Sequence, residues 1–169
     1  TGYLNIDQAT KLVSRHKEKR ELYIEESFVI DKEAAQELAK FRGGTMYLDG
    51  LTFIDEGVAS ELVKFGGGKI VLSGITSINV DVAEELSQFK GSLCLDGLTS
   101  IDKAIAYELS KLSGTLYLDG LSQIDWDIAV RLSKMRGGVH LKGLSGIDRK
   151  SLDVLKNNPM NALPEKYRD

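Results

Sequence analysis

The sequence predicts an α/β solenoid, a stack of similar units whose short strands form one parallel sheet. Three observations predict this fold. A motif returns every 23 to 24 residues; within each unit, apolar residues first alternate and then recur three positions apart. The first spacing is typical of a strand with one buried face, and the second is typical of a helix. Because one such unit cannot bury its own apolar side, neighbouring units must stack.

Each unit begins with a short strand and a turn. In the unit 92–114, Leu93 and Leu95 alternate with residues that face the other side of the sheet, and the pair Asp96-Gly97 follows. Glycine accepts backbone angles that other residues avoid, so this pair predicts a turn directly after the strand. The other units are 21–44, 45–68, 69–91 and 115–137, with a shorter one from Gly138.

The second half of each unit predicts a helix with a defined start and end. An Ile followed by a polar residue recurs at 6–7, 30–31, 54–55, 78–79, 101–102, 124–125 and 147–148. The polar residue, from Asp7 to Asp148, is placed where a helix N-cap belongs, because its side chain can accept bonds from free N–H groups of the first turn. An Ala and a Leu three positions apart form the buried stripe. The glycines that follow, such as Gly91 and Gly114, suit a left-handed C-terminal cap.

The surface of these helices carries two further signals. A Glu precedes a Lys by three positions in Glu37/Lys40, Glu61/Lys64 and Glu108/Lys111, which predicts ion pairs on a solvated face. Trp126 falls in the first turn of its helix. We interpret Trp126 as packing against a neighbouring helix, with an exposed contact site as the alternative.

The N-terminal part is a broken repeat. Ile6-Asp7 keep the register of the repeat, and Ala9 and Leu12 belong to a helical stripe, but the run Arg15–Arg20 is highly charged. We interpret residues 1–20 as a partial repeat that caps this end of the stack, because terminal repeats are atypical. A basic contact patch is the alternative interpretation.

The C-terminal part also departs from the pattern. From residue 149 the repeat degrades, and Asn157-Asn158-Pro159 stops the last helix because proline cannot continue it. We expect the tail to fold over the last rung. The whole chain, 1–169, is therefore predicted to be one domain, with stacked repeats over 21–148 and a C-terminal cap over 149–169.

The repeat Leu-x-Leu-x-Gly-Leu-(Thr/Ser)-x-Ile-Asp, followed by Ala-x-x-Leu, resembles the leucine-rich-repeat superfamily, and more closely its short bacterial variants. The resemblance covers roughly residues 21–155. It implies a right-handed solenoid with the parallel sheet on the concave side and the helices on the convex side. It also leans toward bacterial proteins, some of them exported or at the cell surface, and leaves the compartment of this chain open. The sequence departs from the family just after the strand, where many members carry an Asn or Cys ladder and this chain has Leu51, Ile75, Leu98, Leu121 and Leu144.

Composition narrows the classes of function. The net charge is −3, which argues against nucleic acid as the main partner. No apolar run is long enough to cross a membrane, so we expect no membrane insertion. Cys94 is the only cysteine, which excludes an internal disulfide framework.

Stacking turns each outward strand position into a column of side chains, with rungs roughly 4.8 Å apart. The first column reads Tyr23, Tyr47, Val71, Cys94, Tyr117 and His140, and the second reads Glu25, Asp49, Ser73, Asp96, Asp119 and Lys142. Tyrosines beside acids are typical of a recognition surface, because Tyr supplies contact area at low entropic cost. The alternative is that Tyr suits a strand and Asp suits a turn. The hypothetical binding site consists of Tyr23, Tyr47, Asp49, Asp96, Tyr117, Asp119 and His140.

Catalytic and metal functions fit the pattern less well. Cys94 and His140 are two rungs apart in one column, roughly 10 Å, which is beyond hydrogen-bond reach for a nucleophile and its base. Ser73 interrupts the acidic column, which disfavours a calcium site, and one Cys with two distant His supplies no zinc cluster. We therefore predict that the protein is not an enzyme and holds neither cofactor nor metal.

Two classes of function remain. The first is a non-enzymatic protein-binding module whose partner is a basic or mixed-charge peptide or protein held on the concave face. The second is a structural or spacer segment of a larger protein, for example one at the cell surface, with no ligand of its own. Self-association through the solenoid ends is a third interpretation, because an incompletely capped end exposes unpaired rungs.

Overall fold

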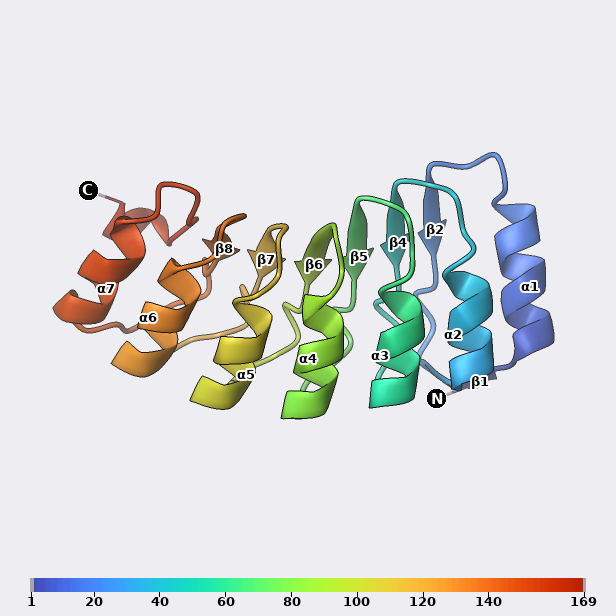
Figure 1. Ribbon diagram of the computed structural model, residues 1–169, viewed down its shortest axis with the longest axis horizontal. Helices are drawn as coiled ribbons and strands as arrows, with labels where there is room; N and C mark the ends of the chain where they lie inside the picture. Colours follow the sequence, from blue (N-terminus) through green and yellow to red (C-terminus); the bar gives the residue numbers. More distant parts are fainter. Residues whose placement is uncertain (1, 169) are drawn as a thin grey trace.

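Strands and helices alternate along the chain, and the strands form a parallel sheet that the helices cover on one face (Figure 1). The structure is a computed structural model and describes residues 2–168. The main sheet has the order β2-β4-β5-β6-β7-β8. Its strands are β2 (Glu21–Tyr23), β4 (Thr45–Tyr47), β5 (Lys69–Val71), β6 (Ser92–Cys94), β7 (Leu116–Tyr117) and β8 (Val139–His140). The predicted α/β fold with a parallel sheet is therefore confirmed.

The register of the sheet follows the sequence repeat. Leu93 of β6 is opposite Leu116 of β7, and Cys94 is opposite Tyr117. Equivalent positions of the other neighbouring units are paired in the same way, with no slip along the sheet. The first column predicted from the sequence, from Tyr23 to His140, is therefore a row of paired positions across the sheet.

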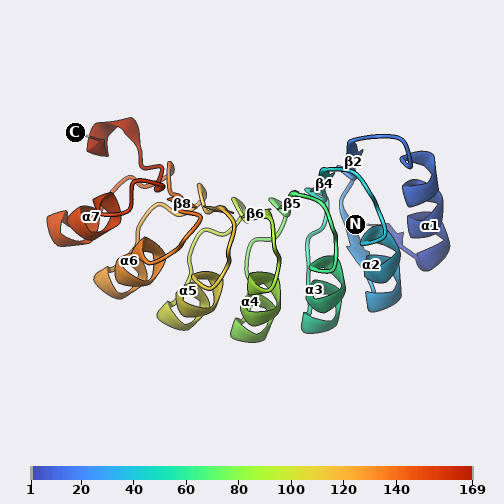
Figure 2. The same ribbon diagram turned by 45° about the horizontal axis from the view of Figure 1, so that its top comes forward.

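Seven helices lie in a row on the covered face within residues 2–168 (Figures 1 and 2). They are α1 (Ile6–Arg15), α2 (Lys32–Leu38), α3 (Glu56–Leu62), α4 (Val80–Ser87), α5 (Lys103–Leu109), α6 (Trp126–Ser133) and α7 (Arg149–Lys156), and a short 3-10 helix, η1 (Glu165–Tyr167), follows. From α2 to α7 the predicted polar residue is the N-cap, and its side chain accepts a bond from the backbone N–H three residues on. These six caps are confirmed. No helix in the described part of the chain is long and apolar enough to span a membrane.

The prediction of Asp7 as the first N-cap is wrong. Helix α1 begins at Ile6, and its cap is Asn5, whose side chain forms a capping box with Gln8. Strand β1 (Gly2–Leu4) pairs with β3 (Phe28–Ile30) and places Leu4 opposite Ile30. Leu4 therefore occupies the position that isoleucine holds in later units, and Ile6 is left exposed.

The left-handed helix ends predicted at the glycines are also wrong. Gly138 is the one glycine with positive φ among residues 2–168, and the C-caps of α2 to α7 are right-handed. The repeated glycines instead allow close approach between rungs: a Cβ at Gly114 would lie 2.1 Å from the carbonyl oxygen of Gly91. The turn glycines obey the same rule, because a Cβ at Gly97 would lie 2.2 Å from the carbonyl oxygen of Ser73.

The core is one continuous layer between the sheet and the helices. Each unit contributes leucines from the strand and an Ala and a Leu from the helix, as with Leu95, Ala106 and Leu109 in the unit 92–114. The rings of Phe41 and Phe65 stack at 5.9 Å between centroids, and Phe89 continues the stack at 6.3 Å. Burial of large side chains at equivalent positions ties each unit to the next.

The two ends of the main sheet are finished differently. Strand β2 is the terminal strand and pairs only with β4. At the other end, Ala162 forms a parallel bridge with His140 of β8, and the N–H of Leu141 donates to the carbonyl of Ala162 at 2.8 Å. Leu163 is buried beside it. The C-terminal tail thus covers the last strand.

Candidate functional site

The candidate site is the face of the main sheet that the helices leave uncovered (Figure 2). Side chains alternate between the two faces of a strand. Leu22, Met46 and Leu93 point into the core and are fully buried, so the residues beside them, Tyr23, Tyr47 and Cys94, point to the uncovered face. The alternation therefore positions every residue of the predicted site except those in the turns.

Tyr23 and Tyr47 form an aromatic pair at the β2 end of this face. Their rings stack with 4.4 Å between centroids and 5° between planes. The hydroxyl of Tyr23 donates to Oε2 of Glu21 at 2.5 Å, and this bond raises the pKa of Tyr23 to about 12. Tyr23 is 47% exposed. The sequence prediction of both tyrosines on one exposed face is consistent with this placement, but Glu21 was missed.

A second aromatic pair lies at the other end of the face. The rings of Tyr117 and His140 are 4.2 Å apart and tilted by 40°. The ammonium of Lys69 lies over the Tyr117 ring, 4.3 Å from its centroid. Nδ1 of His140 is buried with no hydrogen-bond partner among residues 2–168, and burial lowers the pKa of this ring. Tyr117 and His140 are thus brought together as predicted for neighbours in a column.

The middle of the face differs from the prediction. Val71 and Cys94 belong to the outward column, yet they are only 6% and 4% exposed. The thiol of Cys94 donates to Oδ2 of Asp96 at 2.9 Å, and Ser73 Oγ is 3.7 Å from the sulfur. Burial, together with this bond to Asp96, raises the pKa of Cys94 to about 11. A column on the outer face is therefore not uniformly exposed, and the two aromatic pairs flank a covered centre.

The three predicted aspartates hold the turns of successive units together. Oδ1 of Asp49 accepts from the backbone N–H of Ser73 at 3.1 Å, and Oδ1 of Asp96 accepts from that of Asp119 at 2.8 Å. Oδ1 of Asp119 accepts in the same way from Lys142 at 2.7 Å. Each carboxylate thus bonds the equivalent residue of the next unit. This structural role applies to Asp49, Asp96 and Asp119 whatever else they contact.

The geometry around Cys94 does not suit a nucleophile. Tyr117 stands between Cys94 and His140 in the sheet, so the imidazole is not beside the thiol. A thiol needs to lose its proton to act as a nucleophile, and a pKa of about 11 keeps Cys94 protonated at neutral pH.

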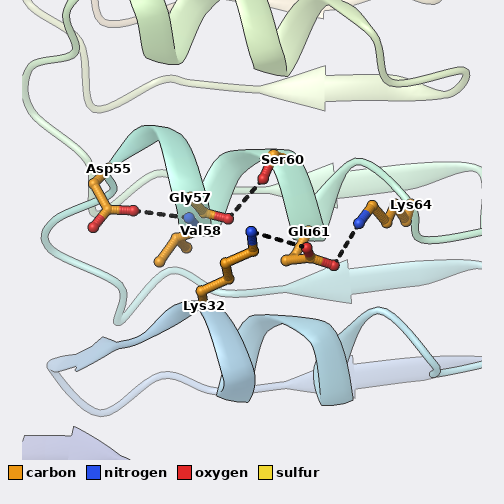
Figure 3. Close-up of polar contacts among 7 residues, drawn as sticks. All are labelled: Lys32, Asp55, Gly57, Val58, Ser60, Glu61 and Lys64. Atoms are coloured by element: carbon orange, nitrogen blue, oxygen red, sulfur yellow. Dashed lines mark hydrogen bonds and ion pairs between the residues drawn. The ribbon is translucent and has the colours of Figure 1, made fainter.

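The helix side presents polar contacts of a different kind. Glu61 of α3 is buried to 5% exposure, and its carboxylate pairs with Lys64 at 2.7 Å and with Lys32 of α2 at 3.8 Å (Figure 3). Lys32 therefore ties two neighbouring helices through one carboxylate. The predicted pairs Glu37/Lys40 and Glu108/Lys111 are also present.

Trp126 contacts the neighbouring helix while remaining partly exposed. The ammonium of Lys150, from α7, lies 4.0 Å from the centroid of its ring. The interpretation of Trp126 as packing against the next helix is consistent with this contact. The indole itself is 36% exposed.

What this face offers a ligand is set by its two aromatic pairs and the charges beside them. No group of three or more His, Cys, Asp or Glu is placed to hold a metal ion in the part of the chain that the structure describes. No protein-family model matches the chain, and no curated protein or solved structure shows significant similarity to it. The arrangement can stack, form hydrogen bonds through the tyrosine hydroxyls, and attract cations at the Glu21 end.

Proposed function

We propose that this chain is a non-enzymatic interaction module that binds a protein or peptide through the uncovered face of the main sheet. We also propose that it is a right-handed solenoid of the leucine-rich-repeat type, with this face on the concave side. The sequence period, the parallel register and the single row of helices support the architecture (Figure 2).

One observation carries the binding proposal: each end of the uncovered face has an aromatic pair with at least one tyrosine that is not buried, Tyr23–Tyr47 at one end and Tyr117–His140 at the other. If these tyrosines only favoured strand formation, valine would do equally well, and Val71 does occupy one position of the same column. Tyr23, which is exposed, instead stacks on the half-buried Tyr47. Rigid aromatic side chains with little entropy to lose are what binding surfaces use.

The test is capture of a partner by the immobilised protein and by two matched variants. Tyr47→Ala with Tyr117→Ala removes one ring from each pair, while Tyr107→Ala removes a tyrosine of α5 that is 47% exposed on the helix side. The aspartates stay unchanged, because they hold the turns. We expect the first variant to lose a protein that wild type and Tyr107→Ala both retain, with circular dichroism showing all three folded. Equal capture by all three would contradict the proposal.

A spacer segment with no ligand is the second candidate function, and the aspartate ladder favours it. Three of the four acidic residues of the second column, Asp49, Asp96 and Asp119, already form hydrogen bonds inside the chain. A spacer needs only a polar surface and a rigid arrangement of its repeating units. Absence of any captured partner under native conditions favours this function, whereas selective loss in the double variant excludes it.

A further inference from the structure

The uncovered face already contains one cation–π contact, between a lysine and a tyrosine of this chain. Lys69 stands two residues before Val71 in β5, and its ammonium reaches across to the ring of Tyr117, 4.3 Å from the centroid. A second exposed tyrosine on the helix side, Tyr107, is covered in the same way by Lys111 at 4.5 Å and by Arg131 at 5.2 Å. The rings of Tyr117 and Tyr107 thus show that ammonium and guanidinium groups pack on accessible tyrosine rings in this protein.

The Tyr23–Tyr47 pair has the same rings but no such cation among residues 2–168. Tyr23 stands on the terminal strand, so one ring face stacks on Tyr47 and no further strand lies against the other. The equivalent of Lys69 in this unit is Glu21, whose carboxylate is bonded to the Tyr23 hydroxyl. The position that supplies a cation to Tyr117 thus supplies a carboxylate beside Tyr23.

The segment that carries this ring, residues 21–26, has only negative charges. Residues 21–26 hold three carboxylates, Glu21, Glu25 and Glu26, and no cation, and all three side chains are exposed. Glu25 is the outward residue that follows Tyr23 at the next alternate position. The hydroxyl of Tyr23 donates to Oε2 of Glu21, and Oε1 accepts no hydrogen bond within residues 2–168. A cation on the open ring face would therefore meet both the ring and an available carboxylate oxygen.

We propose that Tyr23 and Glu21 form the subsite that takes an arginine or lysine side chain of the partner. This inference rests on the proposed binding function and names the chemistry that the partner brings. Arginine fits best, because its planar guanidinium stacks on an aromatic ring and also donates to a carboxylate.

The probe is the peptide acetyl-Gly-Arg-Gly-amide, titrated into the ¹⁵N-labelled protein at low salt and followed by amide chemical shifts. The matched control peptide carries citrulline, which has the shape of arginine without its charge. We expect saturable shifts at Glu21, Tyr23 and Tyr47 with the arginine peptide, and shifts several-fold smaller with the citrulline peptide. Tyr107, equally exposed at 47%, should not respond because two cations already cover it.

Variants separate the ring from the carboxylate. Tyr23→Ser should weaken arginine binding about five-fold, the factor that corresponds to a surface cation–π contact. Glu21→Gln should weaken it and reduce its salt dependence, whereas Tyr23→Phe keeps the ring and should retain most of the affinity. Equal shifts with citrulline, or shifts that persist in Tyr23→Ser, would overturn the inference.

The outcome is independent of the capture experiment. If the double variant Tyr47→Ala with Tyr117→Ala loses a captured partner while the arginine peptide leaves Tyr23 unmoved, the binding function stands and this subsite is wrong. If the arginine peptide titrates Tyr23 and Glu21 while no partner is captured, the subsite stands as a cation site and the protein-binding function fails.

Discussion

At the scale of single residues, Asp96 serves two neighbours at once. Oδ1 accepts from the backbone N–H of Asp119 in the next unit, and Oδ2 accepts from the thiol of Cys94. Removal of both acceptors leaves an unpaired N–H, so we expect Asp96→Ala to lower the free energy of unfolding by about 1–3 kcal/mol. Urea denaturation measures it.

The conservative variant makes this prediction specific. Asp96→Asn keeps an acceptor oxygen for the N–H of Asp119, and its loss should stay under about 1 kcal/mol. Asp153→Ala, at an exposed position of α7, serves as the control and should change stability by less than about 0.5 kcal/mol. If Asp96→Ala matched Asp153→Ala, the ladder would carry no stability.

Cys94 predicts a pH dependence with a definite sign. The pKa of the folded thiol is raised from the ordinary value of 9.0 to about 11, chiefly by burial. The folded state therefore keeps its proton longer than the unfolded state, so this group leaves stability unchanged below about pH 9 and lowers it as pH rises toward 11. Alkylation by iodoacetamide, followed by mass spectrometry, should still accelerate above pH 9. A plateau by pH 9 would contradict the raised pKa.

The same residues show what the sequence could predict about the site. Alternation of side chains correctly placed Tyr23, Tyr47 and Tyr117 on one face, because it depends only on strand geometry. Alternation could not separate Tyr47 from Cys94, which is covered, because exposure depends on the side chains of neighbouring rungs. Glu21 and Lys69 lie two residues before an outward position, so the period of two could have found them.

At the scale of elements, helix α1 tests which residue begins a helix. The structure makes Asn5 the N-cap, whereas the Ile-Asp pattern pointed to Asp7. We expect Asn5→Ala to cost about 1 kcal/mol, and Asp7→Ala only about 0.3–0.5 kcal/mol through its charge in the first turn. Hydrogen exchange of the α1 amides, with Ala9 as reporter, measures the difference locally. Equal effects of the two changes would contradict the assignment of Asn5 as the N-cap.

The error at α1 has a physical cause. In later units the N-cap precedes the buried Ala by four residues and the buried Leu by seven, as Asp31 precedes Ala35 and Leu38. Asn5 stands at the same distances from Ala9 and Leu12. The spacing from the buried Ala and Leu therefore predicts the correct N-cap, because changing which residues are buried is costly. Ile6-Asp7 matched only the two-residue Ile-Asp part of the motif.

Glycines illustrate a limit at the same scale. The turn glycines correctly marked the turns, but Gly114 lies four residues beyond Ser110, the C-cap of α5, so it does not mark the helix end. A Cβ at Gly114 would meet the backbone of the preceding unit, and this contact exists only once two units are stacked. A property of one unit's sequence can locate such a glycine without revealing the neighbour that requires it.

At the scale of the whole molecule, the two edge strands of the main sheet are protected from pairing with other chains in different ways. An exposed strand edge offers unpaired N–H and C=O groups to other chains. Strand β2 is short, and it carries Glu21 and is followed by Glu25 and Glu26, so charge discourages pairing there. Strand β8 instead receives the tail, through Asn161 and Ala162. The repeat predicted the stack between these ends because every unit obeys the same packing rule.

The cover over β8 supplies the last prediction. The N–H of Leu141 donates to the carbonyl of Ala162, the N–H of Ala162 donates to Val139 at 2.9 Å, and Leu163 is buried beside them. A chain ending at Lys156 loses all of these contacts and exposes the edge of β8. We expect it to self-associate with rising concentration in sedimentation velocity, and the amide of Leu141 to lose its protection from hydrogen exchange.

A chain ending at Leu163 is the matched control, because it keeps the bridge from Ala162 to β8 and removes only the residues that follow. We expect this variant to stay monomeric, with the Leu141 amide still protected, because the donor and the acceptor both remain. Two monomeric variants with the same Leu141 exchange as the full chain would show that the tail is not what closes the sheet. Association of the shorter variant alone would show that the segment up to Leu163 is enough to protect the edge of β8. Strand β2 has no such cover within residues 2–168 and depends on its charged residues.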